Sequence, residues 1–155
     1  MPKHYNGFFS YKNKYLVKEK VDNLQKIFNL SLDGIIRLLT YSSYYLYVSK
    51  QYINEYIHFL KEFFNVGDKE LIDIFIKYPR LIEVSASSIR YNSEKLCSYF
   101  GCSLDEVKEM YKTYPLSIYY TANNINADLR FNRNRTDDNK KHILKFPWVL
   151  QCITW

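Results

Sequence analysis

The stretch KYPRLIEVS, residues 77–85, decides the fold because it marks the end of one helix and the start of the next. Pro79 lacks a backbone N–H and disfavours helical geometry at Tyr78, so the preceding helix must end there. A proline also suits the first turn of a new helix. Leu81 and Ile82 predict a single turn of 3-10 type that packs into the core, and Ser85 is placed to cap the following helix.

The features around this stretch recur with a period of 36 residues. Without a gap, Phe28-Asn29-Leu30 aligns with Phe64-Asn65-Val66 and then with Phe100-Gly101-Cys102. Pro79 aligns with Pro115, whereas the first copy has a serine at this position. A fixed period of this length is typical of helical-repeat proteins, in which each unit packs on its neighbours.

Within each copy the apolar pattern predicts two longer helices. Residues 53–64 carry apolar side chains at three- and four-residue steps, which is the stripe of an amphipathic helix. Residues 68–78 show the same stripe. The start of this second helix resembles a capping box, with Gly67 and Glu70 in the box positions, as Ser103 and Glu106 are in the next copy.

We therefore predict an all-α fold in a single domain, 1–155. It is a superhelical solenoid, right- or left-handed, of about 36-residue repeats, each with two α-helices and one short 3-10 helix. The domain divides into a partial unit, three repeats and a degenerate terminal repeat: 1–16, 17–52, 53–88, 89–124 and 125–155. The alignment places Val17 on the core position of Ile53.

The first fifteen residues are basic and contain no acidic residue, which is a feature of organelle-targeting segments. They contain no arginine, however, and Gly7-Phe8-Phe9 aligns with Pro79-Arg80-Leu81. We therefore expect this segment to belong to the fold.

The repeat resembles a known family through residues 59–85, FLKEFFNVGDKELIDIFIKYPRLIEVS, and 99–121, YFGCSLDEVKEMYKTYPLSIYYT. In these stretches a helix ends in Phe-Asn or Phe-Gly, and the second helix ends in Tyr-Pro; in the later one the turn between them leads to Ser-x-Asp-Glu. Together with the unit length, this pattern is similar to the mitochondrial transcription termination factor (mTERF) family over roughly residues 5–151. Tetratricopeptide-type repeats differ, because they have a 34-residue period and a Trp-Leu-Gly pattern.

The resemblance implies a helical superhelix whose concave, basic side holds RNA or double-stranded DNA. It also implies a role in organellar gene expression, in transcription termination or in RNA- or ribosome-related work. The organelle would be the mitochondrion, with the chloroplast or another plastid as the alternative. Two other functions stay open: a structural subunit of an organellar ribonucleoprotein such as the mitochondrial ribosome, and a protein-binding α-solenoid scaffold.

The charge distribution agrees with a polyanionic partner. The net charge is +6, and the first twenty residues carry five lysines against Glu19. Basic ends on a near-neutral body suit contact with nucleic acid. The candidate phosphate-binding residues are Lys14, Arg37, Lys50, Lys77, Arg80, Arg130, Arg133, Arg135, Lys141 and Lys145. The alternative for each is a solvated helix face.

A run of tyrosines, Tyr41, Tyr44, Tyr45 and Tyr47, invites comparison with the aromatic platforms on which single-stranded RNA stacks. Tyr45 aligns with Leu81, however, so part of this run is expected to fill core positions.

No pattern in the sequence points to catalysis, a metal, a cofactor or a small-molecule substrate. The three histidines are scattered, and there is no phosphate-binding glycine loop or nucleophile elbow. Cys97, Cys102 and Cys152 lack metal-ligand spacing, so we expect reduced thiols. No apolar run is long enough to predict a membrane-spanning helix.

Overall fold

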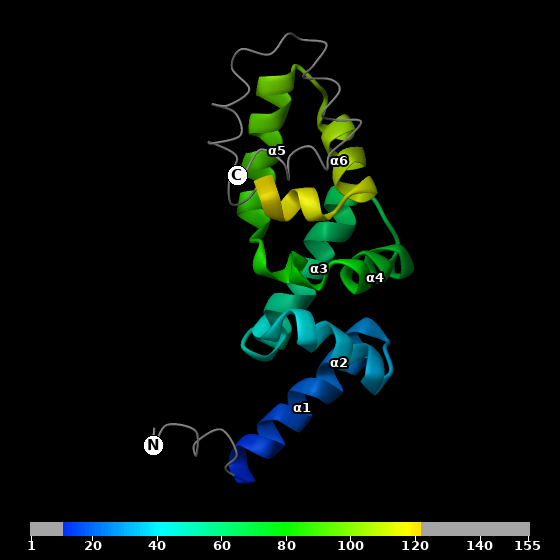
Figure 1. Ribbon diagram of the computed structural model, residues 1–155, viewed down its shortest axis with the longest axis vertical. Coiled ribbons are helices and arrows are strands. Elements are labelled where there is room, and N and C mark those ends of the chain that lie inside the picture. The colour runs from blue at the N-terminus through cyan, green and yellow to red at the C-terminus, as the bar shows by residue number, and fades with distance from the viewer. Residues whose placement is uncertain (1–10, 122–155) are drawn as a thin grey trace.

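A computed structural model describes residues 11–121, with side chains from residue 14 onward, and all of its regular elements are helical. Figure 1 shows the helices following one another along an elongated molecule, from α1 at one end to α5 and α6 at the other. The elements are α1 (Tyr11–Phe28), α2 (Leu32–Tyr41), η1 (Ser43–Leu46), α3 (Lys50–Phe64), α4 (Asp68–Lys77), η2 (Pro79–Glu83), α5 (Ala86–Phe100) and α6 (Leu104–Thr113). The all-α prediction is confirmed.

The helices repeat with the period seen in the sequence. α2, α4 and α6 each have 10 residues and start at residues 32, 68 and 104, a spacing of 36. α3 and α5 likewise start at residues 50 and 86. The unit divisions at residues 52 and 88 therefore fall inside α3 and α5, because these helices begin earlier than the apolar stripe predicts.

Each long helix ends in the same left-handed turn. Asn29, Asn65 and Gly101 have φ values of 49°, 53° and 62°, a region open mainly to glycine and asparagine. The N–H of the residue that follows each one bonds back to a carbonyl in the last turn, as from Cys102 to Cys97 at 3.2 Å. This hydrogen bond is the signature of a Schellman C-cap. The recurring Phe-Asn and Phe-Gly pairs therefore end the helices for a stereochemical reason.

Serines cap most helix starts, and one predicted cap is wrong. Ser85 accepts a hydrogen bond from the Ser88 N–H at 3.1 Å, as predicted. Ser103 and Glu106 form the complete capping box. Gly67 precedes α4 without any side-chain cap, because glycine has no oxygen to accept the bond. Glu70 therefore contributes only its charge near the start of α4.

The stretch from Lys77 to Ser85 behaves as predicted. Tyr78 leaves helical geometry, with φ −135° and ψ 70°, and Pro79 starts the 3-10 helix η2. Leu81 and Ile82 are 3% and 0% exposed. The first copy forms the corresponding helix η1 although it has a serine in place of the proline. In the third copy residues 116–121 are α-helical, so the predicted 3-10 type is wrong there.

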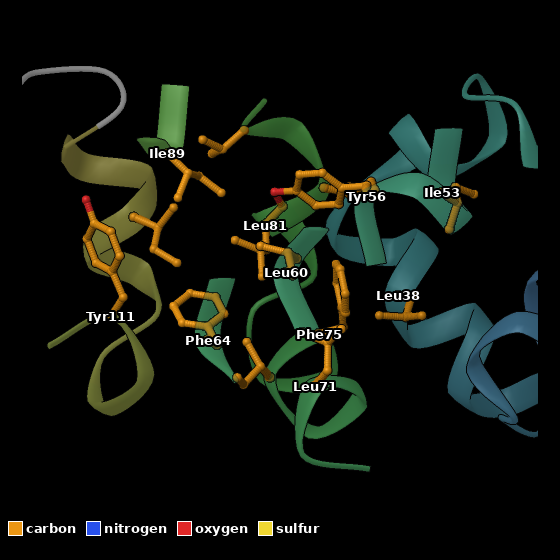
Figure 2. Packing of buried hydrophobic residues seen from close by; sticks show 14 of the residues in the cluster. Leu38, Ile53, Tyr56, Leu60, Phe64, Leu71, Phe75, Leu81, Ile89 and Tyr111 are labelled. Carbon is orange, nitrogen blue, oxygen red and sulfur yellow. The ribbon is translucent and has the colours of Figure 1, made fainter. Parts of the chain in front are cut away.

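Aromatic rings join successive units at the centre of the core. Phe28 of α1, Tyr45 of η1 and Phe75 of α4 meet edge to face, with ring centroids 5.3–6.5 Å apart. Figure 2 shows Phe75 among Leu38, Leu71 and Tyr56. Such pairs add about 0.5–1.5 kcal/mol each to the free energy gained by burying the rings.

Val17 and Leu46 are less buried than the core residues on which the 36-residue shift places them. Val17 is 40% exposed, whereas Ile53 at the equivalent position is 2% exposed. Among the described residues no earlier unit covers the first turns of α1, which explains the difference. Leu46 is only partly buried, unlike Ile82. No helix within residues 11–121 is long and apolar enough to span a membrane.

Candidate nucleic-acid interface

Two of the predicted basic residues, Arg37 and Lys77, lie on the surface formed by α2 and α4. Both are exposed, and neither makes an ion pair or a side-chain hydrogen bond within residues 11–121. Each of these two residues lines a hollow in this surface, and Tyr41 lines both hollows. The first hollow, which we name the α2 hollow, has a volume of about 690 Å³. Arg37 lines it together with Asp33, Thr40 and Ile76.

The second hollow lies where α4 meets η2, and we name it the tyrosine hollow. Its volume is about 160 Å³. Its walls come from α2, from the stretch 77–81 and from residues 115–119. The residues that line it include Tyr41, Lys77, Tyr78, Arg80, Leu116 and Tyr119. The predicted candidates Lys77 and Arg80 therefore line the same hollow, together with three tyrosines.

Arg80 is held by two protein partners. Two of its guanidinium nitrogens, Nη2 and Nε, donate to Glu83 Oε2, at 3.0 Å and 3.1 Å. It also donates to the Tyr119 hydroxyl at 2.7 Å and lies over the Tyr119 ring, 4.4 Å from the centroid. The hydrogen bond to Glu83 is the main cause that raises the pKa of Arg80. Much of its charge and donor capacity is thus already used inside the protein.

The partners of Arg80 belong to a line of polar contacts across successive copies. Ser42, just before η1, donates to Glu83 Oε1 of η2 at 2.8 Å. Arg80 then links Glu83 to Tyr119 in the third copy. We name this set of four residues the polar seam. It connects the three successive short helical segments, so Arg80 has a structural role that its sequence position did not suggest.

The remaining described candidates lie elsewhere. Lys14 is exposed near the start of α1. Lys50, the first residue of α3, lines a hollow of about 310 Å³ between α1 and α3, together with Glu19 and Lys20. Lys20 donates to the Val48 carbonyl at 3.2 Å, a contact that joins α1 to the end of the first copy. The other candidates, Arg130, Arg133, Arg135, Lys141 and Lys145, lie outside the described residues.

The tyrosine run divides as its alignment predicted. Tyr45 is 1% exposed, and its hydroxyl donates to the Pro79 carbonyl at 2.6 Å. Tyr41, Tyr44 and Tyr47 are 69%, 42% and 67% exposed. Only Tyr41 of these three lines either hollow. The sequence prediction missed Tyr78 and Tyr119. Shifting the sequence by two periods, 72 residues, places Tyr119 on Tyr47 and could have identified Tyr119.

The described histidine and cysteines lie at positions that do not point to catalysis. His58 faces Glu62 at 3.2 Å on the exposed side of α3. Cys97 and Cys102 are free thiols in the C-cap of α5, and burial raises the pKa of Cys102 to about 11. Within residues 11–121 no three histidine, cysteine, aspartate or glutamate side chains gather as metal ligands.

Comparisons with known proteins support the helical-repeat fold described above. A search of curated protein sequences found no significant match. A protein-family model described as mTERF matches residues 5–152, nearly the whole chain. This match covers the 36-residue helical repeat, its Schellman turns and its proline-initiated short helix. The chain therefore belongs to the mTERF family of helical-repeat, nucleic-acid-binding proteins, which generally act in organelles.

Proposed function

We propose that this protein binds nucleic acid through the surface of α2, α4 and η2, and that it acts in organellar gene expression. The observation that supports the proposal is that Arg37 and Lys77 are exposed, without ion-pair partners within residues 11–121, around two connected hollows. Asp33 also lines the α2 hollow, but it forms no ion pair with Arg37. Cations of this kind neutralise phosphates and release counterions, which gives salt-dependent binding.

Fluorescence anisotropy with labelled single-stranded RNA, structured RNA and duplex DNA across a range of salt concentrations tests this proposal. Arg37→Ala and Lys77→Ala should each weaken binding and reduce the slope of log K against log salt by about 1. Lys69→Ala is the matched control, because Lys69 is an exposed lysine at the other end of α4, next to Asp68. Absence of binding by the unmodified protein at low salt would refute the proposal. Equal effects of all three substitutions would show that Arg37 and Lys77 are not a specific binding site.

A second function, as a subunit of an organellar ribonucleoprotein, is favoured by the apolar side chains beside these cations. Leu32 and Ile36 of α2 are 52% and 51% exposed, and Ile76 of α4 is 46% exposed. A protein neighbour would cover such side chains while RNA contacts Arg37. Co-sedimentation of the tagged protein with a large ribonucleoprotein, abolished by ribonuclease, would distinguish this function from that of a freely acting regulator.

A further inference from the structure

We propose that the tyrosine hollow binds one unstacked base of a single-stranded nucleic acid. This inference rests on the proposed function and makes it more specific. It identifies a base-binding position next to phosphate-binding side chains, and it predicts that single strands bind better than duplexes.

Two of the aromatic rings that line the tyrosine hollow, those of Tyr78 and Tyr119, are held in place by other side chains. The Tyr78 ring packs edge to face on Tyr114, with centroids 6.4 Å apart. The Tyr119 ring is held by the guanidinium of Arg80 at 4.4 Å. Because both rings are already positioned by these contacts, a ligand that packs on them would lose little side-chain freedom.

Tyr41 differs from the other two tyrosines because it is available for stacking. It is 69% exposed, and no aromatic or cation contact involves its ring within residues 11–121. It is the last residue of α2 and lines both hollows. A base that enters the hollow would therefore pack against Tyr41.

The size of the hollow limits what can enter. Its volume of about 160 Å³ lies below the range of about 300–1,000 Å³ for pockets that enclose whole small molecules. The space suits one planar ring system. A base inside a duplex is stacked on both faces and cannot enter, so the ligand must be single-stranded or locally unpaired.

The charges around the hollow suit the backbone that would carry such a base. Lys77 is exposed and lines the hollow, without an ion pair among the described residues. Arg37 lies four residues before Tyr41, hence on the same face of α2, and lines the neighbouring hollow. Phosphates on the two sides of a base at Tyr41 would thus each meet a cation. The Nε and one terminal nitrogen of Arg80 already donate to Glu83 and Tyr119, so the hollow offers mainly ring faces and fewer donors for base-specific hydrogen bonds.

The experiment compares short oligo(U), oligo(dT), a fully abasic strand of the same length and a blunt duplex, with binding measured by fluorescence anisotropy at one low salt concentration. We expect the base-bearing single strands to bind more tightly than the abasic strand. Tyr41→Ala should weaken binding of both base-bearing strands by roughly 5- to 150-fold, the range for one base stacked on an aromatic side chain. The same substitution should leave abasic binding unchanged.

Two further variants make the result specific to the ring of Tyr41. Tyr41→Phe keeps the ring and should bind like the unmodified protein. Tyr47→Ala removes a tyrosine of similar exposure, 67%, that lies outside both hollows, and should have no effect. Two results would overturn the inference: equal affinity of the unmodified protein for abasic and base-bearing strands, or unaltered affinity of Tyr41→Ala. Either result would leave a protein segment as the occupant of the hollow. If the unmodified protein bound none of these strands, the proposed function itself would be refuted.

Discussion

Two buried tyrosine hydroxyls tie η2 to the core, and their removal should measurably destabilise the protein. Tyr45 donates to the Pro79 carbonyl at 2.6 Å and Tyr56 donates to the Leu81 carbonyl at 2.8 Å. These tyrosines come from η1 and α3, so they connect η2 to two other elements. The perturbation is Tyr45→Phe and Tyr56→Phe, each of which removes one hydroxyl and keeps the ring.

The magnitude follows from what each carbonyl loses. The Leu81 carbonyl keeps a second hydrogen bond, from the Val84 N–H at 3.1 Å, so Tyr56→Phe does not leave it without a partner. The expected loss is then that of one net hydrogen bond, about 1 kcal/mol, and not the larger cost of an orphaned group. Tyr45→Phe removes a hydrogen bond of the same kind, to the Pro79 carbonyl, so a loss of about 1 kcal/mol or more is expected. Truncating the apolar side chain of Leu81, which is 3% exposed, should cost more, about 2–5 kcal/mol for Leu81→Ala.

Urea denaturation followed by circular dichroism at 222 nm measures these differences, because a stability change shifts the midpoint at constant slope. For a chain of this length about 1 kcal/mol corresponds to about 2–4 °C in Tm. Tyr47→Phe, at 67% exposure, is the control and should have no effect. Tyr45→Phe and Tyr56→Phe variants as stable as the unmodified protein would refute the claim that these hydroxyls hold η2.

Three further perturbations test other features. Burial raises the pKa of Tyr111 to about 12 and that of Tyr45 further, while unfolded tyrosine ionises near 10. As the pH rises, tyrosines therefore lose their protons in the unfolded state first. The free energy of unfolding should fall above pH about 10, by up to about 1.4 kcal/mol per pH unit for each tyrosine. Urea titrations at several pH values should show a smaller fall for Tyr111→Phe. Gly101→Ala, at φ 62°, should lower the unfolding free energy by about 1–2 kcal/mol, and Gly101→Asn by less, because asparagine occupies the equivalent position 65. Gly67→Ser adds the missing cap oxygen and should stabilise α4 by a few tenths of a kcal/mol, seen as a small rise in Tm.

The features that local stereochemistry controls were predictable from the sequence. Pro79 ends α4 because of its ring, whatever packs around it. Asn65 and Gly101 end their helices because few other residues adopt positive φ. Tyr45 was separated from the exposed Tyr41 only by the repeat alignment, since the two belong to one unbroken tyrosine-rich run.

Features that depend on neighbouring units were harder to predict. Val17 occupies an aligned core position, but its burial requires a preceding unit that the described residues do not provide. Arg80 stood out as a phosphate ligand because it is a cation after a proline, whereas its partners Glu83 and Tyr119 depend on how successive copies stack. A search that placed position 119 beside position 80, one period and one helical turn later, would have found this contact.

The polar seam has a mechanical consequence for the part of the chain that the structure describes. Apolar contacts between units are insensitive to direction, so packed helices can rotate slightly against each other at little cost. Hydrogen bonds are directional, and those from Ser42 to Glu83 and from Arg80 to Tyr119 weaken when the angle between units changes. In a linear stack, a small angular change at one joint displaces the far end by an amount that grows with distance. Four polar side chains therefore restrict the angles between the units that they connect.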